Sequence, residues 1–219
     1  MDESWTTEGW KSPRRAGIAA LTSRVALQPT GFDEGTYESA QGAIAVANAV
    51  VADRRFTVAS LYAKWEELPE WPNLIFAHKS ALRLLEDLAR HVDAGAENLV
   101  AAGDLNILYR YGEHGDERWA EFYSGVFDRA EELGIPFVGP QAPNGRQADP
   151  WPDELPEGSL CVPTYHHNRQ TPQTATRQLD FVFASEAMKD RVRTRALNEV
   201  CEWGPSDHCR VLIEVDLGV

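Results

Sequence analysis

Acidic side chains stand at the ends of short apolar runs in this chain, and one stands inside such a run. Asp104 closes one run, whereas Asp207 and His208 come directly before another. Asp180 lies inside Leu179–Phe183, where both of its neighbours are apolar. A lone carboxylate is costly to bury, so Asp180 needs a cationic partner. The fold must therefore bring together the ends of apolar runs that are far apart in the sequence, so that the carboxylate of Asp180 can meet a cation.

Length and composition are those of one globular domain. The chain has 219 residues, of which 43% are hydrophobic and 25% are charged, and such a chain can bury a sizeable core. No apolar run approaches the ~18 residues of a membrane span, and the first residues lack the basic-then-apolar order of a signal peptide. The three cysteines, Cys161, Cys201 and Cys209, have no metal-type spacing, which suits a reducing compartment. We therefore expect a single cytoplasmic domain over 1–219, with 1–12 irregular.

The charge balance limits the class of partner. The formal net charge is −13, from 34 acidic and 21 basic residues. Proteins that bind long duplex DNA through its phosphates normally present a broad basic face. Local basic spots occur at Arg14-Arg15, at Arg54-Arg55 and within 191–195, and they are interpreted as solvated surface. The balance disfavours non-specific nucleic-acid binding but allows a phosphate substrate, since a divalent ion supplies positive charge.

Two neighbouring apolar runs indicate a β-hairpin near the start of the chain. Gly42–Val51 and Phe56–Tyr62 are separated by a short polar connection. The first run is rich in alanine, so helix propensity alone would allow a helix. Its valine and isoleucine content and the short connection favour the hairpin.

Helices, a long loop and late strands are predicted further along the chain. Apolar residues at helical spacing predict helices over Asn73–Asp93 and Asp116–Leu133, each followed by a glycine stop signal. Prolines and glycines mark Gly139–Gly158 as a surface loop. Phe181–Phe183 and Cys209–Val215 are predicted strands.

The tetrapeptide Gly-Asp-Leu-Asn at 103–106 combines groups that can act on a phosphate. An extended backbone would aim Asp104 and Asn106 to the same side. A carboxylate can take a proton from water or hold a metal ion, and an amide can donate a hydrogen bond to a charged phosphate oxygen. Asp and Asn are also common turn formers, so a purely structural turn is the other interpretation.

The Asp207-His208 pair and Asp180 add an imidazole and further carboxylates. An acid beside His208 would raise its pKa and favour the protonated form, which can hold a phosphate oxygen. Asp207 can bind a metal ion directly or through water. The alternative for His208 is a loop histidine with one surface hydrogen bond. Asp180 would pair with His208, unless it occupies the exposed side of a one-sided strand.

Together these motifs resemble the endonuclease/exonuclease/phosphatase family, the DNase I-like proteins. The resemblance lies in the order GDLN, then LDFVF after Thr164-Tyr165-His166, then GPSDH before a final strand. Gly17–Arg24 is similar to the family strand that ends in Ser-Arg. Val58–Ala63 is similar to the strand that ends in Tyr-Ala-Pro, with Lys64 in place of the proline. The resemblance covers roughly Pro13–Leu217 and implies an α+β fold, a four-layered α/β/β/α sandwich of two mostly antiparallel sheets flanked by helices.

The resemblance also implies metal-dependent hydrolysis of a phosphate ester, by a phosphodiesterase, nuclease or phosphatase. Asp104 would activate the attacking water and contact the metal, and Asn106 would stabilise the phosphate and share the metal. Asp180 would orient His208, which contacts the scissile phosphate. Asp207 would be a metal ligand.

Two further positions match the family less specifically. Tyr62 falls where some members place a tyrosine or histidine against the phosphate, and His166 falls where members place substrate-contacting residues.

Mg²⁺ is the expected ion, with Mn²⁺ as a substitute, because carboxylate, amide and water ligands suit it and no thiolate cluster indicates zinc. The expected substrate is a nucleic acid or a small phosphorylated molecule.

The start of the chain departs from the family pattern. That pattern begins with a strand carrying an asparagine, a helix and a second strand ending in Gln-Glu, whose glutamate is the principal metal ligand. Met1–Pro13 contains Glu3 and Glu8 but no apolar run to hold either in a strand. We therefore expect an N-terminally truncated sandwich without these elements, either because the true start lies upstream or because the chain is a truncated or divergent member. The second hypothesis is a catalytically disabled member of the family or an interaction protein.

Overall fold

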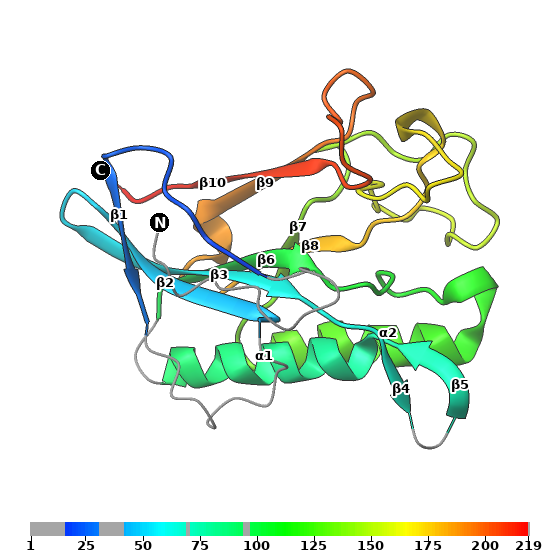
Figure 1. The fold of residues 1–219 in the computed structure, drawn as a ribbon, viewed down its shortest axis with the longest axis horizontal. Helices are drawn as coiled ribbons and strands as arrows, with labels where there is room; N and C mark the ends of the chain where they lie inside the picture. The colour runs from blue at the N-terminus through cyan, green and yellow to red at the C-terminus, as the bar shows by residue number, and fades with distance from the viewer. Residues whose placement is uncertain (1–15, 31–41, 69–70, 94–96, 219) are drawn as a thin grey trace, which may run out of the picture.

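A mixed six-stranded sheet lies at the centre of the molecule (Figure 1). The computed structural model describes residues 16–30, 42–68, 71–93 and 97–218, so the segment expected to be irregular lies outside the described residues. The strands in spatial order are β1 (Val25–Pro29), β2 (Ile44–Val51), β3 (Arg54–Tyr62), β6 (Leu99–Asp104), β8 (Asp180–Ala184) and β7 (Phe137–Gly139). β3 and β6 are parallel, and every other neighbouring pair is antiparallel.

Two helices cover one face of this sheet. α1 (His78–Asp93) and α2 (Glu117–Glu132) run side by side beneath it in Figure 1. Their apolar sides and the facing strand residues form the main core, which includes the fully buried Leu84, Tyr123 and Phe183. This burial supplies the largest favourable contribution to folding, because it removes most apolar area from water.

A two-stranded sheet covers the opposite face. It consists of β9 (Val192–Leu197) and β10 (Arg210–Val215), paired antiparallel, and it lies above the central sheet in Figure 1. A smaller core that includes Val100, Val182 and Met188 fills the space between the two sheets. A separate antiparallel hairpin, β4 (Glu66–Leu68) and β5 (Trp71–Phe76), projects from the helical side.

The predicted α/β sandwich is confirmed. Within the described ranges, α1 and α2 are the only α-helices, so these residues form the helical layer on one face but not the second helical layer of the expected four. Neither helix in these ranges has the length and apolar character needed to cross a membrane.

Most predicted elements occur close to their expected limits. The early apolar runs form the hairpin of β2 and β3 rather than a helix. α2 begins after Asp116, whose side chain accepts hydrogen bonds from the backbone N–H groups of Arg118 and Trp119 and so caps the helix. The region after Gly139 forms the expected long loop.

Two predicted limits were wrong. The helix expected over Asn73–Asp93 begins only at His78, because residues up to Phe76 belong to β5. Leu74 and Phe76 are two residues apart, a spacing that fits a strand as well as the edge of a helical pattern. The strand expected at Gly17–Arg24 is irregular and β1 starts at Val25, and the apolar Leu21 is 97% exposed.

Gly103 is predicted to tolerate no side chain. A Cβ atom there would lie 1.9 Å from the carbonyl oxygen of Leu61 on the neighbouring strand, so β3 and β6 would have to separate. We expect Gly103→Ala to lower the free energy of unfolding by about 3 kcal/mol, measured by urea denaturation. Gly125→Ala in α2 is the matched control, because its new Cβ meets nothing within 4 Å and should stabilise the helix by about 0.5–1 kcal/mol. Equal stability of Gly103→Ala and the wild type would contradict the packing argument.

Candidate active site

Three polar residues lie in one row across the end of the central sheet. The strand register pairs Tyr62 of β3 with Asp104 of β6, and Asp104 with Asp180 of β8. Residues directly opposite one another on adjacent strands present their side chains on the same face. Val100 is four residues from Asp104 and Val182 is two residues from Asp180, so these valines share the face of the two carboxylates, and they pack toward β9 and β10. The row therefore faces the side of the second sheet.

A turn at the end of β6, rather than an extended backbone, joins Asp104 to Asn106. Asn106 has a φ of 51°, in the left-handed region where asparagine is tolerated better than most residues. Its backbone N–H donates to Asp104 Oδ1 at 2.9 Å, and its Nδ2 donates to Asp104 Oδ2 at 3.1 Å. Nδ2 also donates to the Ala63 carbonyl oxygen at 2.9 Å. The turn and the polar site therefore coincide, and Asn106 binds both carboxylate oxygens.

The segment around Thr164 connects the His208 loop to the central sheet. The buried Thr164 hydroxyl accepts hydrogen bonds from the backbone N–H groups of Leu179 and Asp180, each at 3.0 Å. On its other side, the Thr164 carbonyl oxygen accepts from Cys209 N at 2.8 Å. The loop itself is held by Trp203, whose Nε1 donates to the Ser206 carbonyl oxygen at 3.0 Å. These contacts bring the residue before β10 beside the first residue of β8.

Asp180 and His208 form the ion pair that the sequence predicts. His208 Nδ1 lies 2.8 Å from Asp180 Oδ2, and His208 Nε2 lies 3.9 Å from Asp104 Oδ2. Burial lowers the pKa of His208, but the hydrogen bond and negative charge of Asp180, helped by Asp104 and Asp207, outweigh it and raise the pKa to about 9. The imidazole is therefore protonated at neutral pH, with Nδ1 engaged and Nε2 directed toward Asp104.

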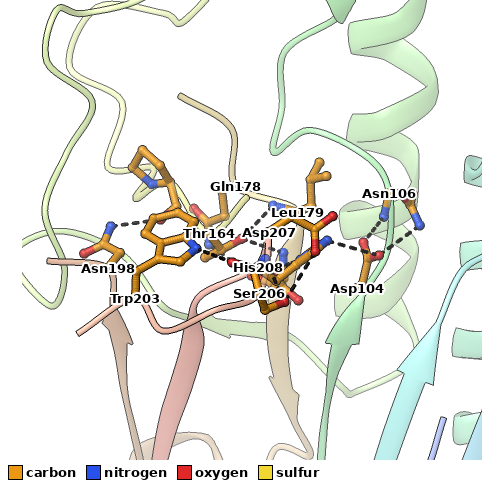
Figure 2. A network of polar contacts seen from close by, with 12 residues as sticks. Asp104, Asn106, Thr164, Gln178, Leu179, Asn198, Trp203, Ser206, Asp207 and His208 are labelled. Atoms are coloured by element: carbon orange, nitrogen blue, oxygen red, sulfur yellow. Dashed lines mark hydrogen bonds and ion pairs between the residues drawn. The ribbon is translucent and has the colours of Figure 1, made fainter. Parts of the chain in front are cut away.

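These side chains line one cavity of about 780 Å³. Figure 2 shows His208 between Asp104 on one side and the Trp203 loop on the other. The predicted site residues on its wall are Tyr62, Asp104, Asn106, Asp207 and His208, while Asp180 reaches it through His208. The sequence prediction that these residues meet in space is thus realised in the fold.

His166 does not line this cavity, so its predicted contact with substrate has no support from the geometry and stays a prediction. Its ring lies against Trp203, with centroids 5.4 Å apart, and its Nδ1 is 3.1 Å from the His167 carbonyl oxygen. Its neighbours Tyr165 and His167 line the cavity instead. An extended segment directs alternate side chains to opposite sides, and the sequence could not indicate which side faces the cavity.

The oxygen ligands fit a partly hydrated Mg²⁺ better than a complete protein cage. Asp104 and Asp207 line the same cavity, and Mg²⁺ in proteins often takes one or two carboxylates and keeps several waters. Among the residues that the structure describes, no three His, Cys, Asp or Glu side chains are grouped to hold a metal ion. The amide of Asn106 is engaged within the protein, because its Oδ1 accepts from Trp65 Nε1 at 2.9 Å. Metal ligation by Asp104, Asp207 and Asn106 stays a prediction.

The thiol beside the site is not a nucleophile at neutral pH. Cys209 is buried directly after His208, and burial, with the negative charge of Asp180, raises its pKa to about 12. A protonated thiol is a poor nucleophile. The reactive groups of the cavity are therefore carboxylates and an imidazolium.

The sequence motifs missed two features of the cavity wall. Trp65 lies beside Asn106. Arg177 lines the same cavity and is bound by Glu113 at 2.7 Å and by Glu154 at 3.5 Å. Arg177 comes three residues before Asp180, which is a local signal, but Glu113 begins the short 3-10 helix Glu113–Gly115 and Glu154 lies in the long loop after Gly139. Only tertiary structure brings Glu113 and Glu154 to the guanidinium.

Comparison with known proteins identifies the fold. No family model matches the sequence, and no curated protein matches it. The endonuclease domain of TRAS1, a telomere-specific non-LTR retrotransposon, superposes with a TM-score of 0.50 at 18% identity, over 81% of this chain and 65% of that chain. The 3′-5′ exonuclease NExo from Neisseria meningitidis gives a TM-score of 0.50 at 21% identity, over 78% of this chain and 64% of that chain.

The similarity to these structures concerns architecture alone, given the low identities. This chain spans less than two thirds of the length of either structure. Both are of the endonuclease/exonuclease/phosphatase type, which is the architecture that the sequence motifs predict. The chain therefore has the DNase I-like sandwich fold.

Proposed function

We propose that this chain hydrolyses phosphate esters by attack of water on phosphorus. The observation that carries the proposal is the meeting of Asp104, Asp180 and His208 at one cavity, although they are far apart in the sequence. A carboxylate base beside a fixed imidazolium suits a reaction that takes a proton from water and builds negative charge on phosphate. Two of the solved structures that this chain resembles are named as an endonuclease and an exonuclease, which supports a phosphoester substrate.

In the proposed reaction, residues are assigned to the attack by water and to the stabilisation of charge on the phosphate. Asp104 accepts a proton from the attacking water as the new bond between oxygen and phosphorus forms. The bond from phosphorus to the leaving oxygen breaks, and that oxygen takes a proton from solvent. His208, held protonated by Asp180, donates a hydrogen bond from Nε2 to a phosphate oxygen as charge builds there. Tyr62 lies on the wall of the same cavity and is assigned to contact with the phosphate.

Asp104 and Asp207 are the residues that would hold Mg²⁺ or Mn²⁺. When bound, the ion supplies Lewis-acid polarisation of the phosphate. Asn106 fixes the Asp104 carboxylate through its two N–H contacts. Both hydrogens of its Nδ2 are donated within the protein, to Asp104 and to Ala63, so its predicted donation to phosphate would require one of these two bonds to be exchanged for the substrate.

The charges of the cavity favour a small phosphoester or a short nucleic acid over long duplex DNA. Arg177 on the cavity wall is already bound by Glu113 and Glu154, and the chain carries a net charge of −13. A continuous basic track along a duplex is what strong duplex binding normally requires.

A hydrolysis assay with bis(p-nitrophenyl) phosphate tests the proposal directly. We expect release of p-nitrophenol in the presence of Mg²⁺ or Mn²⁺, and a fall to the uncatalysed background with EDTA, because the ion is needed to neutralise the phosphate. The mono-ester p-nitrophenyl phosphate and short single-stranded and duplex oligonucleotides extend the assay to the other substrate classes. If none of these substrates is hydrolysed with either Mg²⁺ or Mn²⁺, the proposal is wrong.

A calorimetric titration with Mg²⁺ separates the enzyme from the disabled alternative. Mg²⁺ binding with a dissociation constant in the micromolar to low-millimolar range supports the hydrolase, provided that Asp207→Asn abolishes this binding. A flat titration supports a protein that keeps the fold without the ion.

A further inference from the structure

Trp65 makes a hydrogen bond to the candidate active site that none of the sequence motifs includes. Its Nε1 donates to Asn106 Oδ1 at 2.9 Å, and its side chain lines the cavity beside Asp104 and Asn106. The residue belongs to the connection between β3 and β4 and is 38% exposed. The ring is thus partly buried, and its one polar atom is directed at a residue of the candidate active site.

The direction of this bond fixes the orientation of the Asn106 amide. An indole nitrogen can only donate a hydrogen bond, so it must face the amide oxygen. The Nδ2 group then faces Asp104 Oδ2 at 3.1 Å and the Ala63 carbonyl oxygen at 2.9 Å. A flipped amide would place its oxygen against both of these acceptors and its Nδ2 against the indole N–H. All three partners therefore favour one orientation.

The position of Trp65 is itself fixed by the framework. The preceding residue Lys64 donates its backbone N–H to the Ser80 hydroxyl at 2.9 Å, and Ser80 is buried in α1. Ala63 donates its backbone N–H to the Asp104 carbonyl oxygen at 2.8 Å. The connection is thus attached to both α1 and β6, and the indole N–H reaches Asn106 from a rigid base.

We propose that Trp65 is a positioning residue, which fixes the Asp104 carboxylate through the amide of Asn106. This inference rests on the proposed hydrolytic function and adds a residue to it. Trp65 acts on the orientation of the carboxylate and not on the chemistry of the phosphate. Misalignment of the base with the attacking water lowers the reaction rate more than the affinity for substrate. Loss of the Trp65 contact should therefore lower kcat more than it changes KM.

Trp65→Phe removes the N–H group and keeps an aromatic ring. We expect kcat for the diester to fall about tenfold, the scale of one lost hydrogen bond, while KM changes less than about twofold. Trp151→Phe is the matched control. Trp151 is 40% exposed, and its Nε1 donates to the Leu155 carbonyl oxygen at 2.9 Å outside this cavity, so the same chemical change there should leave kcat unaltered.

Two further measurements separate positioning from a general loss of structure. In an Asn106→Ala background, Trp65→Phe should cause no further fall in kcat, because the group through which it acts is already gone. In ¹⁵N-labelled protein, the side-chain NH₂ resonances of Asn106 should shift in Trp65→Phe and stay unchanged in Trp151→Phe. Asn106→Asp keeps the acceptor for Trp65 but loses the donor to Asp104, and it should lower kcat at least as far as Trp65→Phe.

The outcomes distinguish this inference from the function on which it rests. A wild-type protein without hydrolytic activity overturns the proposed function, and this inference with it. An active wild type whose kcat is unchanged by Trp65→Phe overturns the inference alone. A Trp65→Phe effect that persists in full in the Asn106→Ala background also overturns it, since the effect would then not pass through the amide.

Discussion

Asp104→Asn should lower kcat for phosphodiester hydrolysis about a thousandfold, the usual scale for loss of a general base. The substitution keeps the size of the side chain but removes the carboxylate that we propose takes the proton from water. It also removes the negative charge that lies 3.9 Å from His208 Nε2. The measurement is steady-state hydrolysis of bis(p-nitrophenyl) phosphate with saturating Mg²⁺.

The control for Asp104→Asn is Asp153→Asn. Asp153 is exposed in the loop after Trp151 and does not line the active-site cavity, so its substitution should leave kcat within about twofold. Matching urea midpoints for the two variants would show that both fold. A folded Asp104→Asn protein that retains most of its activity would remove Asp104 from the mechanism.

The pair Asp180 and His208 should behave as one unit. His208→Gln removes the imidazolium that we propose contacts the phosphate, and Asp180→Asn removes the carboxylate that binds this imidazolium at 2.8 Å. Each substitution should lower kcat/KM about a hundredfold, because charge stabilisation by an aligned donor is lost. The double variant should be no worse than His208→Gln alone, since Asp180 acts through the imidazole.

The control for this pair is His91→Gln, in the last turn of α1 and away from the cavity. Its kcat/KM should equal that of the wild type. Additive losses in the double variant would mean that Asp180 has a role independent of His208. An unimpaired His208→Gln would refute the assignment of the imidazolium to the phosphate.

The sequence was sufficient to predict the strands on which the site is built. The hairpin of β2 and β3, the strand before Asp104 and the strand after Asp180 follow from apolar runs with polar ends. The pairing of Asp180 with His208 followed from the cost of burying an unpartnered carboxylate. Both conclusions depend on local patterns or on a strong energetic rule, and such information is present in a single sequence.

Other features of the fold and site depend on long-range contacts that the sequence leaves undetermined. Phe76 fits a helix and a strand equally well, and only its pairing with β4 decides between them. Tyr165 and His166 are adjacent in an extended segment, so their side chains point to opposite sides. The sequence does not determine which side faces the cavity, and the structure places Tyr165 there. Trp65 and Arg177 reach the cavity only through their tertiary neighbours.

The register across β3, β6 and β8 sets how the chain can vary without losing its site. Tyr62, Asp104 and Asp180 share one face only because their strands align residue by residue. Deleting or inserting one residue in β6 would turn the carboxylate toward the helices and bury it in an apolar layer. Strand length is therefore under tighter constraint than strand composition, and related proteins should show insertions in the loops around the cavity but none within these three strands.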